Sequence, residues 1–292
     1  MRLAAFLYQG QPGVGIVSAN GQSIQPLAAP AAELALGALP LVEALVEGRA
    51  LPASHGPALT PGQVQLLAPI PRPRRNIFCV GKNYHAHARE FAGSGFDSSA
   101  KSGGDIPADP ILFSKVPECV VGPHHPIRIP TAVSTAIDYE AELCVVIGRG
   151  GKGIREEDAL GHVWGYTIVN DVTARDWQSR HQQWLMGKSF DTFCPMGPWL
   201  VSADEVDGQN TQVKCWVNGE ERQNASTRDL IFGIPKLIAT LSAGITLYPG
   251  DLIATGTPVG VGIGFKPPKY LQAGDVVKIE IDGIGVLENR VE

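Results

Sequence analysis

The sequence lacks the cysteine spacing that a disulfide framework or a zinc site requires. Its five cysteines are odd in number, form no CxxC pair, and mostly lie in apolar runs typical of strands. We therefore expect buried, reduced thiols, as in a cytosolic protein. The positions are Cys79, Cys119, Cys144, Cys194 and Cys215.

A long apolar run and an excess of basic residues are missing as well. No stretch is long enough to span a bilayer, and the apolar start over residues 1–10 is too short for a signal peptide. The 24 Lys and Arg residues are outnumbered by 29 Asp and Glu residues, which gives a net charge of −5. No broad basic face is therefore available to neutralise phosphates. We expect a cytoplasmic protein with neither a membrane nor a nucleic-acid partner.

Glycine and proline, by contrast, are abundant, with 34 and 23 among 292 residues. This favours many turns and short strands over long helices. Hydrophobic residues make up 44% and charged residues 18%, as in a globular chain with a sizeable core. Strands and short helices alternate irregularly, without a repeat or a series of βαβ units. The pattern predicts an α+β, mainly β, architecture.

The proline-spaced segment 69–75 reads as an extended linker. It divides the chain into a predicted small N-terminal β/α domain, 1–70, and a larger domain, 71–292. Apolar runs between turn residues predict short strands in the first domain, and helical periodicity predicts one helix that Gly48 ends. The strands are expected at 2–8, 14–19 and 23–25, and the helix at 31–48.

In the second domain, the same patterns predict two helices and a strand-rich C-terminal part. Segment 93–110 is rich in Gly and Ser, so it is expected to be disordered or to act as a lid. The predicted helices are 174–185 and 230–241, and the predicted C-terminal strands are 246–252, 276–281 and 285–289.

Two glutamates one residue apart, Glu140 and Glu142, lie in the strand-like run 138–147. Strand side chains alternate between faces, so the two carboxylates point the same way and repel unless a proton or cation separates them. A third acid, Asp171, ends another apolar run. Three carboxylates without a Cys or His ligand suit a hard cation such as Mg²⁺, Mn²⁺ or Ca²⁺. The alternative is a solvated strand face on which charges alternate with core residues.

Three glycine-rich segments resemble phosphate loops only superficially. Segment 187–189 ends like a Walker A motif, but position 182 is Gln where that motif needs Gly. Segment 148–153 lacks the motif spacing, and segment 256–264 runs into Pro267 and Pro268, where a dinucleotide fold needs a helix. We predict that none of them binds a nucleotide.

Five motifs in the second domain occur in a fixed order. Together they resemble the fumarylacetoacetate hydrolase family over residues 70–290, and 188–198 looks particularly like the FAHD2-type and bacterial acylpyruvase-like branch. The motifs are NYHAHARE at 83–90, DYEAE at 138–142, NDVTARDWQ at 170–178, GKSFDT at 187–192 and ATGTP at 254–258.

This resemblance implies a mixed β-sandwich-roll catalytic domain behind a small N-terminal domain, usually in a homodimer. It also implies that Glu140, Glu142 and Asp171 bind one divalent cation, Mg²⁺ or Mn²⁺, with Ca²⁺ possible in crystals. That ion agrees with the one chosen above from ligand type alone.

The resemblance further implies a catalytic group of His87, Glu90 and Lys188. His87 and Glu90 are three residues apart, so on a helix they share a face, and a carboxylate beside imidazole suits a water-activating base. Lys188 is implied to contact a substrate oxygen and stabilise enolate charge. Without the family motifs, the alternative interpretation is that His87 and Lys188 are surface residues. We expect a structural role for His85.

The implied substrate contacts are Gln178 and Thr257. Gln178 lies seven residues after Asp171, which places it two helical turns into the segment that Asp171 leads. Arg175 is expected either to bind a substrate carboxylate or to form a salt bridge with Asp176 or with a metal-binding carboxylate.

The expected reaction is the hydrolysis of a C–C bond in a 2,4-dioxo acid, which releases pyruvate and a carboxylic acid. The same residues could serve as an oxaloacetate keto–enol tautomerase or decarboxylase, or as a 2-hydroxydienoate hydratase or isomerase. A non-catalytic binding protein is a further alternative, which the complete set of motif residues disfavours.

Overall fold

Strands β9 (Ala141–Ile147) and β10 (Val163–Asn170) run antiparallel in the interior of the largest sheet, and the predicted metal ligands lie at their ends. The computed structural model describes residues 1–92 and 106–292. The predicted flexible segment 93–110 lies mostly outside the described residues. Among those residues, no helix is long and apolar enough to cross a bilayer.

The large sheet has 11 strands, most of them in the order β3-β2-β1-β12-β10-β9-β15-β5-β6, with β4 paired to β1 and β7 to β12. It mixes parallel and antiparallel pairs, and the abundance of strands with few helices agrees with the predicted α+β, mainly β, class. Its strands are β1 Arg2–Tyr8, β2 Gln11–Val17, β3 Ile24–Pro26, β4 Gln65–Leu66, β5 Ile77–Gly81, β6 Ile111–Lys115, β7 Val120–Val121, β9 Ala141–Ile147, β10 Val163–Asn170, β12 Cys194–Ser202 and β15 Leu252–Ala254.

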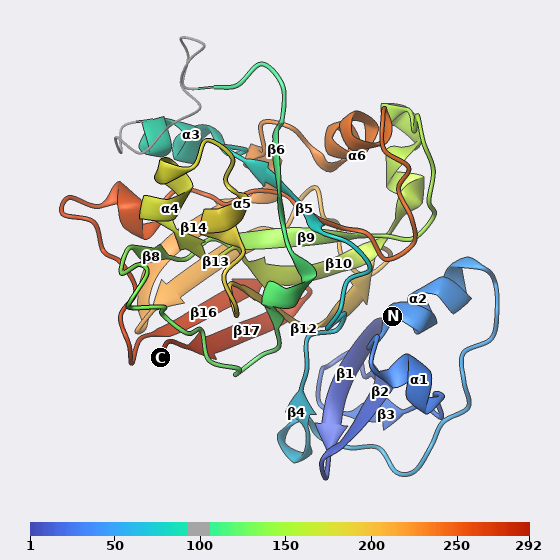
Figure 1. The fold of residues 1–292 in the computed structure, drawn as a ribbon. Helices are drawn as coiled ribbons and strands as arrows, with labels where there is room; N and C mark the ends of the chain where they lie inside the picture. Colours follow the sequence, from blue (N-terminus) through green and yellow to red (C-terminus); the bar gives the residue numbers. More distant parts are fainter. Residues whose placement is uncertain (93–105) are drawn as a thin grey trace.

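A four-stranded antiparallel sheet in the order β14-β13-β16-β17 packs against the large sheet, and β8 and β11 form a short separate pair. Figure 1 shows the four-stranded sheet facing β10 and β12. The strands are β8 Ile137–Asp138, β11 Thr173–Ala174, β13 Gln212–Val217, β14 Glu220–Ser226, β16 Val276–Ile281 and β17 Gly285–Arg290.

The helices are few and short, in keeping with the glycine and proline content. Figure 1 shows α3, α4 and α5 together on one side of the large sheet, close to β5 and β6. The α-helices are α1 Ala31–Leu34, α2 Leu39–Val46, α3 His85–Ala92, α4 Arg175–Arg180, α5 Leu185–Lys188 and α6 Ile234–Ser242. Short 3₁₀ helices cover Pro61–Gln63, Pro117–Cys119, Glu156–His162, Thr227–Asp229 and Gly262–Gly264.

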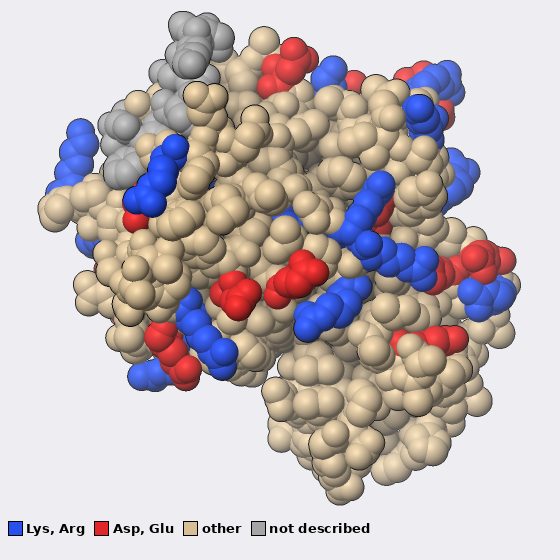
Figure 2. Space-filling model, in the orientation of Figure 1, with Lys and Arg blue, Asp and Glu red and all other residues tan. Residues whose placement is uncertain are grey.

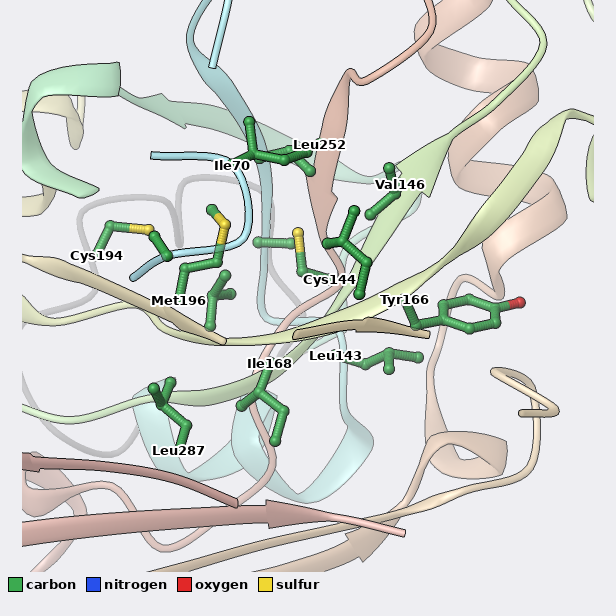
Figure 3. Close-up of a cluster of buried hydrophobic side chains, with 14 of the residues drawn as sticks. Ile70, Leu143, Cys144, Val146, Tyr166, Ile168, Cys194, Met196, Leu252 and Leu287 are labelled. Atoms are coloured by element: carbon green, nitrogen blue, oxygen red, sulfur yellow. The ribbon is translucent and has the colours of Figure 1, made fainter. Parts of the chain in front are cut away.

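Side chains at alternate positions along the strands fill the space between the two sheets. In Figure 3, Ile168 of β10 points toward Leu287 of β17, whereas Cys144 and Met196 lie on the opposite face of the large sheet. Ile168 pairs directly with Leu143 of β9. Leu143 therefore faces the four-stranded sheet, and Glu142 belongs to the opposite face, as Cys144 does.

Several predicted elements have different bounds. The helix expected at 31–48 is two helices, because Gly37 adopts a left-handed φ of 62° between them. Gly48, with a φ of 70°, follows the second helix as predicted. The other differences are small. The strands expected at 14–19 and 23–25 begin and end within three residues of the predicted bounds, and β17 is one residue longer than the strand expected at 285–289.

Three predictions in the second domain were wrong in extent. The helix expected at 174–185 stops at Arg180, because His181 is extended, and Trp184 beyond it packs on Phe113. The helix expected at 230–241 begins only at Ile234, after extended Gly233. The strand expected at 246–252 overlaps β15 only at Leu252, since Gly250 with a φ of 83° turns the chain just before β15.

The first 70 residues form the lobe drawn in blue in Figure 1. Its strand β1 pairs with β12, where Leu3 lies opposite Leu200, so the large sheet continues across the predicted boundary. The division into domains 1–70 and 71–292 stays a prediction.

All five cysteines are free and buried, as expected. On the face shown in Figure 2, basic and acidic side chains are interspersed.

Candidate active site and metal centre

The ends of β9 and β10 bring the three acidic residues together. Glu142 lies directly opposite Val169, and Asp171 follows two residues later on the same face. The Glu140 N–H donates to Asn170 Oδ1 (3.0 Å), and the Asp171 N–H donates to the Glu140 carbonyl (2.9 Å). Backbone pairing thus fixes the positions of all three carboxylates.

Glu140, Glu142 and Asp171 each offer an oxygen within 4.8 Å of the others. Their exposed fractions are 5%, 1% and 0%. The alternative of a solvated strand face is therefore wrong, because charges on such a face would lie in water. A buried acidic triad of this size can bind a metal ion, as its donor atoms suggested.

Two buried lysines neutralise part of this charge. Lys188 Nζ donates to Glu140 Oε2 (2.8 Å) and Asp171 Oδ2 (2.7 Å). Lys115 Nζ donates to Asp171 Oδ1 at 2.6 Å. Lys188 comes from α5, which Trp184 anchors against Phe113. The sequence patterns did not predict a role for Lys115. A single lysine at the end of an apolar strand was the only signal that could have indicated one.

Arg175 forms the salt bridge to a metal-site carboxylate rather than to Asp176. Its Nη1 lies 2.7 Å from Glu140 Oε1 and 3.1 Å from Gln178 Oε1, and its Nε donates to Asp138 Oδ2 at 2.8 Å. Asp138, fully buried, is the second functional residue that the sequence reading missed. Arg175 Nη2 is buried and has no hydrogen-bond partner among the described residues. It is thus a donor available for an anionic ligand.

The buried carboxylates of this cluster differ in their ion pairs. Asp138, Glu140 and Asp171 each pair with one or two of the cations Lys115, Arg175 and Lys188. Glu142 accepts the Gly256 N–H at 2.9 Å and has no ion pair among the described residues. A divalent cation next to Glu142 would supply positive charge there, so the residues present fit a metal ion.

Neighbouring charges act in opposite directions on the two glutamates. Burial disfavours the charged form of Glu140, but Lys188 and Arg175 outweigh this effect and lower the pKa of Glu140 to about 2. Burial, together with Asp171 and Glu140, raises the pKa of Glu142 well above its ordinary value. Burial and the neighbouring carboxylates therefore favour the protonated form of Glu142 more than in an ordinary glutamate.

This difference predicts a pH-dependent response to metal. Because the folded-state pKa of Glu142 is raised, the stability that its proton contributes is complete below the unfolded-state pKa and is lost as pH rises through the folded-state pKa. Metal binding requires the proton to leave, so affinity rises over the same range. We expect the increase in melting temperature caused by Mg²⁺ or Mn²⁺ to grow as the pH rises above the ordinary pKa of a glutamate.

The matched variant is Glu142→Gln, which keeps the shape and removes the titrating group. Its response to metal should be weak and should no longer vary with pH. A wild-type response in this variant would contradict the assignment of Glu142 as a ligand.

His87 and Glu90 form the predicted pair on α3. His87 Nδ1 lies 3.0 Å from Glu90 Oε2, and the exposed fractions of the two side chains are 5% and 13%. A carboxylate partner favours the proton on Nδ1, which leaves Nε2 as the basic nitrogen. His85, on the same helix, is exposed. The helix thus separates the two histidines as their predicted roles require.

One cavity brings most of the predicted residues together. Its walls are aromatic at Phe91, Phe113 and Trp184, and most of its other lining residues are polar. They include Lys82, a further cation for which the sequence predicted no role. The predicted site residues in its lining are His87, Glu140, Glu142, Arg175, Gln178, Lys188 and Thr257.

The side chains of Gln178 and Thr257 already form hydrogen bonds within the protein. Gln178 lies on the same helix as Arg175, three residues on, and not on a helix led by Asp171. The Thr257 hydroxyl donates to the Ala141 carbonyl (3.0 Å) and accepts from Gln223 (2.8 Å). It can therefore offer a ligand only a remaining lone pair. The substrate contacts of both residues stay predictions.

Comparison with known proteins agrees with this geometry. Residues 76–292 match the family described as fumarylacetoacetate (FAA) hydrolase, C-terminal. The chain is 51% identical over 230 residues to "Oxaloacetate tautomerase YisK" of Bacillus subtilis (strain 168), covering 78% of this chain and 73% of that protein. It is 42% identical over 304 residues to "Oxaloacetate tautomerase FAHD2A, mitochondrial" of Bos taurus, covering 100% of this chain and 91% of the relative.

Solved structures extend the similarity to the whole chain. A fumarylacetoacetate hydrolase (EaFAH) from Exiguobacterium antarcticum superposes with a TM-score of 0.83 at 39% identity, covering 100% of this chain and 99% of the other. Maleylpyruvate hydrolase from Sphingobium sp. SYK-6, in complex with manganese(II) and pyruvate, superposes with a TM-score of 0.77 at 33% identity, covering 100% and 98%.

The family match covers residues 76–292, the two relatives cover 78% and 100% of this chain, and the three acidic residues of the motifs lie together in the structure. The chain is an enzyme of the fumarylacetoacetate hydrolase family.

Proposed function

We propose that the enzyme catalyses the keto–enol tautomerisation of a small 2-oxo dicarboxylate such as oxaloacetate. The observation that carries the proposal is His87, which is paired with Glu90 and lines one cavity with Lys188, Glu140 and Glu142. A base and a cationic donor on one cavity are what a proton shift between a carbon and an oxygen requires. The choice of this reaction over hydrolysis rests on the relatives named oxaloacetate tautomerases.

The reaction moves one proton and leaves the carbon skeleton intact. In the keto-to-enol direction, His87 Nε2 takes a proton from C3 as the C2–C3 double bond forms, and the imidazolium then gives a proton to the C2 oxygen. Glu90 holds the Nδ1–H of the resulting imidazolium. The ammonium of Lys188 stabilises the negative charge that develops on the C2 oxygen. The reverse direction uses the same groups in the opposite order.

Glu140, Glu142 and Asp171 would hold a divalent cation, and Mg²⁺ or Mn²⁺ is the choice that their oxygens favour. When bound, this ion would supply Lewis-acid polarisation of the 2-oxo group. The cations lining the cavity suit a substrate with two carboxylates. Arg175 Nη2, buried and unpaired among the described residues, is the donor we assign to one of them.

Hydrolysis of a 2,4-dioxo acid remains the second candidate. The specific observation in its favour is the similarity to the maleylpyruvate hydrolase over the whole chain. The same His87–Glu90 pair could activate a water molecule there. The two reactions differ in whether a C–C bond breaks, so the product decides between them.

A two-substrate assay tests the proposal. With Mg²⁺ or Mn²⁺, the protein is expected to accelerate the decay of enol absorbance from oxaloacetate without forming pyruvate or carbon dioxide beyond the background of metal alone. Protein treated with a chelator provides the control. Faster release of pyruvate from an acylpyruvate than enol decay from oxaloacetate would assign the site to hydrolysis. Rapid carbon dioxide release from oxaloacetate would assign it to decarboxylation.

A further inference from the structure

The glycine-rich loop 256–264 binds the protein's own carboxylates with its backbone N–H groups. A series of N–H groups in such a loop is suited to anions. The sequence excluded it as a nucleotide site, and the structure shows which anions it holds. The hydrogen bonds run from Gly256 to Glu142 (2.9 Å), from Gly260 to Glu90 (3.0 Å), and from Gly262 and Ile263 to Asp138 (2.6 and 3.0 Å).

Gly264, another glycine of this loop, lies next to Glu90 of the His87–Glu90 pair and donates no hydrogen bond to it among the described residues. A Cβ added to Gly264 would lie 2.0 Å from Glu90 Oε1, 2.5 Å from its Cδ and 2.7 Å from its Cγ. All three nearest atoms therefore belong to the Glu90 side chain. Glu90 lies in this space while it accepts the Gly260 N–H and contacts His87.

We propose that Gly264 is a positioning residue for catalysis. The absence of a side chain at this position allows the Glu90 carboxylate to lie between the Gly260 N–H and His87 Nδ1. Glu90 in turn orients the imidazole toward the substrate. This inference rests on the proposed role of His87 as the base.

The geometry makes Gly264→Ala selective for Glu90. An ordinary Cβ contact is at least 3.4 Å, so a methyl group at 2.0 Å would displace the carboxylate by more than 1 Å. Gly264 does not need a left-handed φ, and the atoms in the way are the far end of a flexible side chain. Gly260 differs, because it has a φ of 107° and its added Cβ would lie 1.8 Å from a backbone oxygen, that of Arg222. Alanine at Gly260 would strain the loop itself.

A double-mutant cycle tests the proposal with wild-type enzyme, Gly264→Ala, Glu90→Ala and the double variant. We expect Gly264→Ala to lower kcat by about 10²-fold with little change in KM, as a displacement of about 1 Å in a catalytic group does. Its pH–rate profile should match that of Glu90→Ala. Adding Gly264→Ala to Glu90→Ala should have no further effect, because the methyl group then fills the space that Glu90 leaves.

The control is Gly62→Ala. Gly62 also lies in a 3₁₀ helix, but its added Cβ would meet nothing within 4 Å. This variant should keep the wild-type kcat.

The outcomes separate the positioning role from the function on which it rests. Wild-type turnover in Glu90→Ala would overturn the proposed role of the pair. A slow Glu90→Ala combined with a wild-type Gly264→Ala, or with effects that multiply, would overturn the positioning role alone. If Gly264→Ala folds poorly, the double variant should regain thermal stability, and continued instability would overturn the proposal.

Discussion

Replacement of His87 by alanine is expected to lower kcat by about 10²–10⁴, the range for loss of a positioned general base. The imidazole lies in the cavity wall with its Nδ1 3.0 Å from Glu90 Oε2. No metal-site carboxylate depends on it for a hydrogen bond among the described residues. The KM for substrate and the thermal shift caused by metal should therefore change little, and the loss should appear in kcat.

Solvent deuterium exchange at C3 of oxaloacetate measures the step assigned to His87, and the rate of enol decay measures turnover. Both rates should fall together in His87→Ala. The matched control is His85→Ala on the same helix, where the exposed ring leaves turnover unchanged. Exchange at the wild-type rate in His87→Ala would refute the role of His87 as the base at C3.

Lys115→Met is expected to destabilise the protein by about 3–5 kcal/mol, the range for breaking a buried ion pair from one side. Lys115 is fully buried. Burial opposes its charge, but Asp171 outweighs this effect and raises the pKa of Lys115 above its ordinary value. Its Nζ also donates to the carbonyl groups of Val172 and Lys188. Methionine keeps the length of the side chain and leaves Asp171 and both carbonyl groups without this donor.

Urea unfolding measures this loss, and titration of the folded variant with Mn²⁺ measures its second consequence. Because Lys115 orients Asp171, which we propose as a metal ligand, metal affinity should fall by about 10–100-fold. The control is Lys278→Met, a strand lysine with 39% of its side chain exposed and a partner, Glu280, at 3.5 Å. An exposed pair of this kind contributes at most about 1 kcal/mol. A loss at Lys115 no greater than at Lys278 would show that the buried contacts add no net stability.

The fold followed from the sequence where a local pattern was sufficient. Alternation predicted the strand at 276–281 with its observed bounds, and glycine predicted the end of the helix before Gly48. Patterns failed where distant parts of the chain changed the local outcome. Residues 174–185 have a helical pattern throughout, but the packing of Trp184 on Phe113 of β6 accompanies the break between α4 and α5. That break places Lys188 against the acidic triad.

The sequence by itself determined the acids of the site, because strand geometry puts Glu140 and Glu142 on one face whatever surrounds them. It also determined the pairing of His87 with Glu90, since residues three apart meet on any helix. Tertiary structure alone decided how these groups are held. Lys115 meets Asp171 across 56 positions, and the Gly260 N–H meets Glu90 across 170. No local periodicity records such contacts, because they arise only when separate strands and loops pack together and bury their charges in one place.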